Sequence, residues 1–298
     1  MSKPQNTLSQ SVKISGFGLH TGAEVSLHFQ PAAVDYGVVF KRVDLDGAPE
    51  VPALASFVTH TERGTTLEKG AAAVSTVEHV LAALTGLDID NCLIEVDGPE
   101  MPIMDGSSLP FVKVLEEAGT KAQDKDKQCF EIKESIRFYD AEEDVELIAV
   151  PADEYQVSVM VDYGTKVLGS QSAQLHRMSD FKSEIAPCRT FSFLHELELL
   201  LDHGLIRGGD LNNAIVYVDQ ELSPEKLEKL KKAFKKEQVS VKSNGILDNL
   251  DLHFTNEAAR HKLLDVIGDL ALILDDKFSL CALPITAFLE TPPIISAI

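Results

Sequence analysis

The sequence predicts an α+β protein, in which strands and helices occupy separate stretches of the chain. In each half, segments with the apolar–polar alternation of strands come first, and longer apolar runs typical of helices follow. The glycine patterns GxGxxG and GxxxxGK[ST], which mark nucleotide-binding parallel sheets, do not occur in the sequence. Hydrophobic residues make up 44% and charged residues 25% of the 298 positions, which is ordinary globular composition.

Strands in the first half are predicted at residues 12–14, 24–29, 38–40, 71–74 and 92–96. Ser75 and Glu78 have the S-x-x-E spacing of a capping box and precede an apolar run that stops at Gly86. We therefore expect a short helix there. A second helix is expected over 110–118, ending before Gly119.

Residues 120–128 are polar and show no periodicity, so they are the best candidate for a linker. We expect one domain over residues 1–122, a linker over 123–128 and a second domain over 129–298. Strands in the second half are predicted at 131–138, 145–150, 157–161 and 214–218. Helices are predicted near 193–201, from Pro224, and from Glu257 to about Leu274, where Asn256 is the candidate cap.

The charge balance excludes some classes of partner. Lys and Arg number 27 against 47 Asp and Glu, a net charge of −20, which repels nucleic acid and anionic membranes. The four cysteines are scattered, and no signal-like segment or long apolar stretch occurs. We expect a cytoplasmic monomer with no nucleic-acid partner and no membrane span.

Two groups of residues could carry chemistry. Glu78 and His79 place a carboxylate beside an imidazole at the start of the first helix. On the last helix, His261, Asp265 and Asp269 follow one another at i, i+4 and i+8, so they lie along one stripe. From spacing alone, a polar stripe with a His–Asp hydrogen bond and a metal site are equally good interpretations.

A catalytic zinc ion needs three protein ligands. His79, His261 and Asp265 would supply two nitrogens and one oxygen, and Glu78 would lie beside a ligand, where it could accept a proton from water. The same ligand set also suits non-haem iron. No pattern in the sequence itself brings residue 79 to residue 261.

Several blocks of sequence resemble the zinc-dependent UDP-3-O-acyl-N-acetylglucosamine deacetylases of lipid A biosynthesis. These blocks are residues 15–22, 75–91, 102–108, 186–191 and 261–270. The resemblance implies a two-domain sandwich, each domain a β-sheet with two helices packed against those of the other domain. It implies that UDP-3-O-(3-hydroxyacyl)-N-acetylglucosamine is the substrate and that acetate is released.

The resemblance also implies roles for individual residues. His79, His261 and Asp265 match the zinc ligands, Glu78 the general base, and Thr190 a donor to the oxyanion. Phe191 matches an aromatic residue at the sugar ring, and Lys262 a lysine that contacts the sugar nucleotide. The wall of a passage for the acyl chain is implied for Gly209, Leu211, Ala214 and Val216.

The sequence departs from the family near its C-terminus. In the family, the position of Asp269 is the carboxylate partner of a downstream histidine, but here the last histidine is His261. The tail suits neither a strand followed by a helix nor the family's ending, so we expect a reading-frame change or truncation past residue 273. Without a histidine to act as the acid, we expect turnover to be lowered by ~10²–10⁴-fold. The alternative is a catalytically impaired protein that binds the UDP-sugar or the acyl chain.

Overall fold

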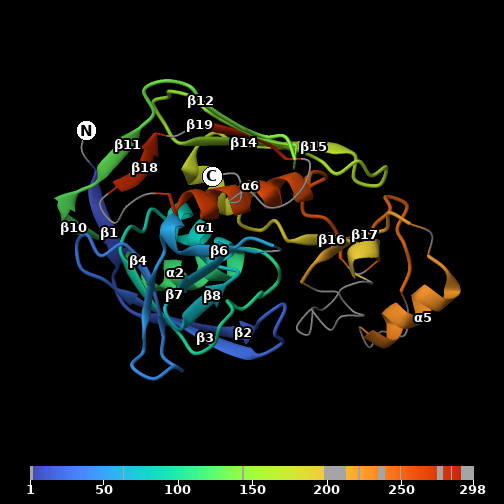
Figure 1. Ribbon diagram of the computed structural model, residues 1–298, viewed down its shortest axis with the longest axis horizontal. Coiled ribbons are helices and arrows are strands. Elements are labelled where there is room, and N and C mark those ends of the chain that lie inside the picture. Colours follow the sequence, from blue (N-terminus) through green and yellow to red (C-terminus); the bar gives the residue numbers. More distant parts are fainter. Residues whose placement is uncertain are drawn as a thin grey trace.

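The computed structural model describes residues 3–62, 64–142, 144–197, 213–220, 222–233, 239–248, 250–273, 278–282 and 284–289. Two five-stranded sheets enclose a layer of helices, so the α+β prediction is confirmed (Figure 1). Among the described residues, no helix combines the length and the apolar character that a membrane span requires.

The first sheet has the strand order β2-β3-β9-β4-β5. Its strands are β2 (Val12–Phe17), β3 (Glu24–Pro31), β9 (Cys92–Val96), β4 (Val38–Arg42) and β5 (Glu50–Pro52). Side chains of β3 alternate between buried and more exposed positions, with Val25, Leu27 and Phe29 facing the core. The predicted strands at 12–14, 24–29, 38–40 and 92–96 therefore belong to one sheet.

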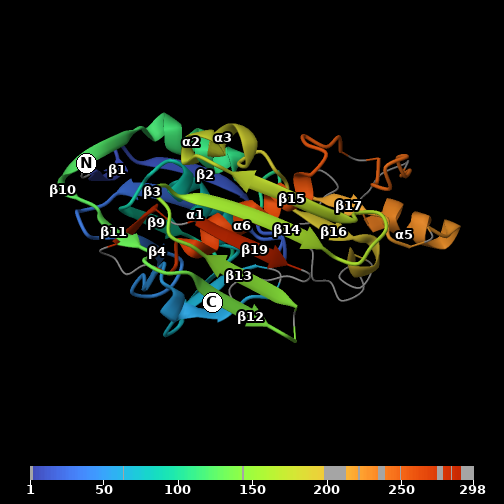
Figure 2. The same ribbon diagram turned by 90° about the horizontal axis from the view of Figure 1, so that it is seen from above.

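The second sheet has the order β12-β13-β19-β14-β15; it runs along the top of the molecule in Figure 1 and faces the viewer in Figure 2. Its strands are β12 (Ile136–Asp140), β13 (Val145–Ala149), β19 (Pro284–Leu289), β14 (Gln156–Asp162) and β15 (Ser170–Leu175). Both sheets show the same succession of antiparallel, antiparallel, parallel and antiparallel pairings. The two halves therefore share one topology, in which β19 takes the place that β9 has in the first half.

The C-terminal tail contributes two strands, β18 (Phe278–Ala282) and β19. The expectation was that this segment does not suit a strand followed by a helix, and its described residues form two strands, which were not predicted. β19 pairs with β13 on one side and β14 on the other. Hydrogen bonds from both neighbours impose the strand conformation, which the local pattern of the tail does not indicate.

The remaining strands form small sheets. Three of them pair as β6 (Val58–His60), β7 (Thr66–Lys69) and β8 (Ala72–Ser75), next to the 3-10 turn η1 (Ala55–Phe57). β16 (Phe191–Phe193) and β17 (Ile215–Tyr217) are parallel, and β11 (Gln128–Glu131) pairs with β18. The strand predicted over 131–138 is thus interrupted between β11 and β12.

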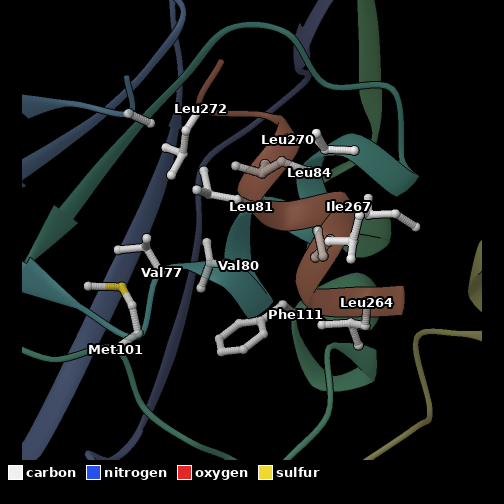
Figure 3. Close-up of a cluster of buried hydrophobic side chains, with 14 of the residues drawn as sticks. Val77, Val80, Leu81, Leu84, Met101, Phe111, Leu264, Ile267, Leu270 and Leu272 are labelled. Atoms are coloured by element: carbon white, nitrogen blue, oxygen red, sulfur yellow. The ribbon is translucent and has the colours of Figure 1, made fainter. Parts of the chain in front are cut away.

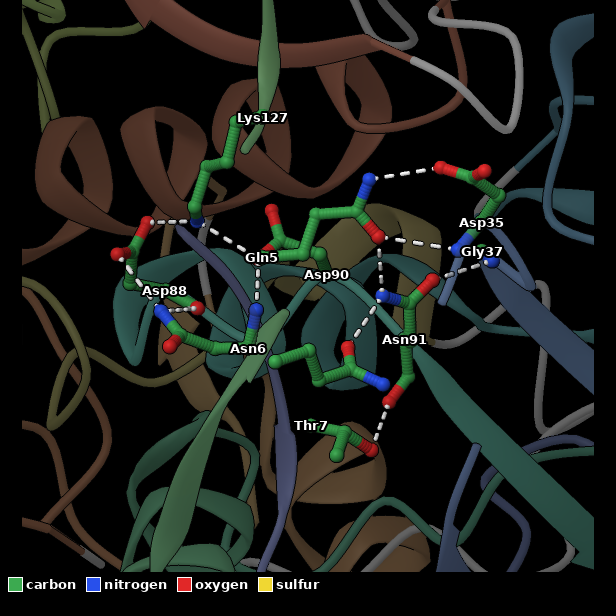
Figure 4. A network of polar contacts seen from close by, with 10 residues as sticks. Gln5, Asn6, Thr7, Asp35, Gly37, Asp88, Asp90, Asn91 and Lys127 are labelled. Carbon is green, nitrogen blue, oxygen red and sulfur yellow. Dashed lines mark hydrogen bonds and ion pairs between the residues drawn. The ribbon is translucent and has the colours of Figure 1, made fainter. Parts of the chain in front are cut away.

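The predicted linker is a regular strand rather than an irregular segment. Residues Thr120–Asp126 form β10, which pairs antiparallel with β1 (Pro4–Leu8). Figure 4 shows the polar network that ties these strands to the loop after the first helix. The ammonium group of Lys127 lies 2.7 Å from Asp88 and 2.7 Å from Asp90, and the buried Asn91 amide donates to Gln5 and Gln123. Long-range polar contacts, which have no local sequence signal, hold this segment extended.

The helical layer consists of α1 (Glu78–Gly86), α2 (Leu109–Ala118) and α6 (Glu257–Leu270). η2 (Met178–Asp180) and the four-residue α3 (Phe181–Glu184) lie near α2, and α5 (Pro224–Ala233) projects at one end of the molecule (Figure 1). Of the helix predicted near 193–201, residues 194–197 are helical, Phe193 ends β16, and 198–201 lie outside the described residues. α6 ends four residues earlier than predicted.

The predicted capping box is wrong. Ser75 ends β8, and its hydroxyl donates to the carbonyl of Pro99, while α1 begins at Glu78 with no side-chain cap. Asn256 occupies the N-cap position of α6 as predicted, but its side-chain amide donates to the carbonyl of Ser172. Tertiary partners therefore compete successfully for both side chains.

One apolar core joins the two halves. Figure 3 shows Val80, Leu81 and Leu84 of α1 in one buried cluster with Leu264 and Ile267 of α6. The same cluster continues into both five-stranded sheets. Burying side chains of this size is worth ~1.5–3 kcal/mol each, so the contact between α1 and α6 is a principal source of stability.

Candidate metal and catalytic site

The site lies where the start of α1 meets the middle of α6. Gly268 makes this close approach possible, because a Cβ atom at residue 268 would lie 2.1 Å from the carbonyl oxygen of Glu78. Ser108, at the N-cap of α2, donates its hydroxyl to the carbonyl of His79 and fixes α1 from its other side. The helix that carries Glu78 and His79 is therefore held against the helix that carries the His261 stripe.

His79, His261 and Asp265 are all buried, and their ligand atoms lie within 4.8 Å of one another. Asp265 Oδ1 is 3.7 Å from His79 Nε2 and 3.5 Å from His261 Nε2. Ligand atoms ~2.1 Å from a tetrahedral ion lie roughly 3.4 Å apart, so these separations suit a single ion. The structure thus brings together the three residues that the sequence singles out.

Two buried polar atoms of this group lack hydrogen-bond partners among the described residues. They are Asp265 Oδ1 and His79 Nδ1. A buried acceptor without a partner is costly, and a metal ion would remove that cost for Asp265 Oδ1. Of the two interpretations left open by spacing, a solvent-facing stripe is excluded by the burial. A metal-binding group fits the residues present.

The protonation states also suit a metal ligand set. Burial, followed by the proximity of His261, lowers the pKa of His79 to about 3, and burial lowers the pKa of His261. Burial by itself raises the pKa of Asp265, but His261, Lys262 and His79 outweigh it and the pKa is lowered overall. At neutral pH the group therefore consists of two neutral imidazoles and a carboxylate, the forms that bind a metal.

The tautomer of His261 is set by the neighbouring segment. His261 Nδ1 lies 3.0 Å from the carbonyl oxygen of Cys188, which can only accept a hydrogen bond. Nδ1 therefore carries the proton, and Nε2 offers its lone pair to the group.

Two further carboxyls, those of Glu78 and Asp269, are buried beside the group. The amide of Thr65 donates to Glu78 Oε2 at 3.0 Å, and the Thr65 hydroxyl donates to Asp269 Oδ1 at 2.8 Å. Burial, then the charge of Asp265, raises the pKa of Glu78 to about 7, and burial raises the pKa of Asp269 well above its usual value. Glu78 can therefore exchange a proton near neutral pH, as a general base must.

Residues 188–191 line one side of the site. The amide of Thr190 donates to the carbonyl of Gly106, and its carbonyl accepts from the amide of Ile215. Next to it, the Phe191 ring lies 6.4 Å from the His261 ring. Thr190 is thus held by backbone hydrogen bonds close to the predicted metal group.

Lys262 points toward the same region. Its ammonium donates to Asp265 Oδ2 at 2.7 Å and lies 5.7 Å from the centre of the Phe191 ring. Burial alone lowers the pKa of Lys262, but Asp265, Tyr163 and Glu78 together outweigh it and the pKa is raised overall. The side chain is therefore a fixed cation beside the ring, not a freely solvated charge.

Of the four residues expected to line an acyl passage, the structure describes two. Gly209 and Leu211 lie outside the described residues. Ala214 directly precedes β17, and Val216 is buried in a small apolar cluster with Leu194 and Leu230.

Some residues that build the site were not singled out from the sequence. Thr65 lies in an ordinary-looking turn, and no local signal marks it. Arg189 and Glu257 form a buried ion pair at 2.9 Å, although they are 68 positions apart. Gly268 did carry a signal, because a glycine inside an apolar helix often marks a close approach of another backbone.

Known proteins similar to this chain include deacetylases. The family model described as UDP-3-O-acyl N-acetylglycosamine deacetylase matches residues 5–231 and 225–279. A bifunctional enzyme LpxC/FabZ of Chlorobaculum tepidum is 46% identical over 272 residues, which are 90% of this chain and 58% of that protein. A UDP-3-O-acyl-N-acetylglucosamine deacetylase of Myxococcus xanthus is 39% identical, over 90% of this chain and 77% of that protein.

A further relative with the same deacetylase name, from Chlamydia pneumoniae, is 38% identical over 92% of this chain and 89% of its own length. The chain spans 58% of the length of the bifunctional relatives that it matches.

Proposed function

Because this chain belongs to the UDP-3-O-acyl N-acetylglycosamine deacetylase family, we propose that it removes the acetyl group from UDP-3-O-(3-hydroxyacyl)-N-acetylglucosamine in lipid A biosynthesis. The reaction is hydrolysis of the acetamide, which releases acetate and leaves a free amine on the sugar. The observation that carries the proposal is the convergence of His79, His261 and Asp265 into one buried group with Glu78 beside it.

The proposed cofactor is zinc, held by His79, His261 and Asp265. Two nitrogens and one oxygen form a ligand set that zinc accepts in catalytic sites. A bound zinc ion supplies Lewis acidity, which polarises a carbonyl and makes water more acidic. The unpartnered Asp265 Oδ1 supports this assignment.

Glu78 is the proposed general base. Its Oε2 is held by the amide of Thr65, and its pKa of about 7 lets the carboxylate take a proton from the attacking water at neutral pH. The departing amine then needs a proton, because an amide nitrogen leaves poorly as an anion. Protonated Glu78 is the group proposed to return that proton, because a pKa of about 7 lets it hold the proton at neutral pH.

The other proposed roles concern the substrate. Thr190 is proposed to donate to the oxyanion, which its position next to Phe191 supports, because the Phe191 ring lies 6.4 Å from the His261 ring. Phe191 is proposed to contact the sugar ring, and Lys262 the anionic sugar nucleotide. Asp269 is proposed to act with Glu78, because Thr65 donates a hydrogen bond to each of the two carboxyls. Gly209, Leu211, Ala214 and Val216 are proposed to line the acyl passage on the ground of the family resemblance alone.

We further propose that the protein acts in the cytoplasm as a monomer. The acidic composition and the scattered cysteines support the compartment.

The proposal is tested by measuring acetate release from the UDP-3-O-acyl sugar by the purified protein. Release should be abolished by a chelator, restored by zinc, and lost in His79→Ala, because that variant lacks one of three ligands. His176→Ala, at an exposed histidine away from the site, is the matched control and should keep wild-type activity.

The alternatives give different results in the same experiment. Tight substrate binding with no acetate release would support a binding protein. Metal analysis that finds iron, with activity restored by iron and not by zinc, would overturn the zinc assignment.

A further inference from the structure

We propose that the turn formed by Gly64 and Thr65 is a positioning element, which sets the orientation of the two buried carboxyls of Glu78 and Asp269. This inference rests on the proposed function, because it assigns a role in the same reaction. Neither residue is proposed to touch the reacting atoms.

Thr65 bridges the two carboxyls with two different donors. Its backbone amide holds Glu78 Oε2 at 3.0 Å and its hydroxyl holds Asp269 Oδ1 at 2.8 Å. Thr65 is itself only 3% exposed, so water does not compete for these donors. The two carboxyls come from different helices, and a single residue outside both helices ties them together.

Gly64 acts on the other oxygen of Glu78. Its φ of +152° is rarely adopted by residues with a side chain, and a Cβ atom there would lie 3.2 Å from Glu78 Oε1 and 3.5 Å from Thr76 Oγ1. The missing side chain therefore leaves room for Oε1 while the next residue holds Oε2. Together, Gly64 and Thr65 restrict the Glu78 carboxylate to one orientation.

This arrangement matters for the reaction rate because both carboxyls are buried. Glu78 and Asp269 are both buried, and carboxyls without donors in such surroundings would turn toward any available partner. A general base that can rotate spends less time in the geometry that reacts, which lowers the rate without weakening substrate binding. The turn therefore contributes to kcat rather than to KM.

The test compares Thr65→Val with Thr65→Ser. Valine has the shape of threonine and keeps the backbone amide, but it removes the hydroxyl donor to Asp269. We expect kcat to fall roughly tenfold, the effect of one lost hydrogen bond, while KM and zinc content stay unchanged. Serine keeps both donors and should recover most of the lost rate. A Thr65→Val enzyme with wild-type kcat would overturn the proposal.

Gly64→Ala provides a second, independent variant. It should lower kcat with little change in KM, because the added methyl group displaces Glu78 Oε1. Gly70→Ala is the matched control, since Gly70 also has positive φ, +63°, but a Cβ atom there meets nothing within 4 Å. Equal loss of kcat in both variants would indicate backbone strain alone and contradict the positioning role.

Failure of the inference can be told apart from failure of the proposed function. If the wild-type protein releases no acetate, the deacetylase assignment fails. Crystal structures of the wild type and Thr65→Val then decide the positioning role. Rotation of the Asp269 carboxyl away from residue 65 would support it, and unchanged carboxyl positions would refute it.

Discussion

At the scale of single residues, the geometry of the site depends on a few closely packed backbone atoms. Gly268 lets the backbone of α6 approach that of α1, and Cys188 presents the carbonyl that fixes the tautomer of His261. Such residues contribute geometry rather than chemistry. Their replacement should therefore change both stability and the spacing of the predicted ligands.

We expect Gly268→Ala to destabilise the protein by ~1–3 kcal/mol, because the new Cβ atom would lie 2.1 Å from the Glu78 carbonyl oxygen and force the helices apart. Zinc affinity should fall as well, since His79 and Asp265 lie on the two helices that separate. Urea unfolding and chelator competition measure the two effects. In an unobstructed helix the same change is stabilising by ~1 kcal/mol, so a gain in stability would contradict the close approach.

At the scale of elements, α6 is anchored at its N-terminal end. The fully buried Glu257 accepts hydrogen bonds from Arg189 and from the amide of His253. Arg189 lies between Cys188 and Thr190, so this ion pair sets how segment 188–190 lies against the helix that carries His261.

We expect Glu257→Ala to cost ~3–5 kcal/mol of unfolding free energy, because it leaves the Arg189 charge buried without its partner. Glu257→Gln, which keeps the shape and some of the hydrogen bonds, should cost less. The control is Glu116→Ala, which breaks the exposed Glu116–Lys182 pair and should cost ~1 kcal/mol or less. Similar losses for Glu257→Ala and Glu116→Ala in denaturant unfolding would argue against a buried anchor.

At the scale of the whole molecule, two halves with the same sheet topology bury their helices against each other. The second sheet is complete only with β19, which lies between β13 and β14. The tail is therefore a structural part of the second half, equivalent to β9 of the first.

We expect Ala287→Pro to cost ~3 kcal/mol or more, because a central strand loses an amide donor and Ala287 pairs with both Leu147 and Val159. Glu50→Pro, at the first residue of the edge strand β5, is the control and should be tolerated much better. Thermal unfolding measures both. An Ala287→Pro protein as stable as the wild type would mean that β19 does not occupy the centre of the sheet.

Much of the fold could be predicted from local pattern. The strand at residues 92–96 and the helix at 110–118 agree with β9 and α2 to within one residue, because apolar spacing and a terminal glycine define both. The capping box at Ser75 is wrong, and neither the strand β10 over the expected linker nor the strands of the tail were predicted. In each case partners distant in the sequence provide hydrogen bonds that local pattern does not reveal. The division into domains 1–122 and 129–298 stays a prediction.

The sequence alone determined which chemistry is available, since helical periodicity places His261, Asp265 and Asp269 on one stripe and Glu78 next to His79. Only the tertiary structure decided that these two sets meet, that Asp265 Oδ1 is buried without a partner, and that Thr65 ties Glu78 to Asp269. The physical reason is that side-chain periodicity is a local property of a helix. The meeting of residues 79 and 261 depends instead on how α1 and α6 bury their apolar faces between two sheets.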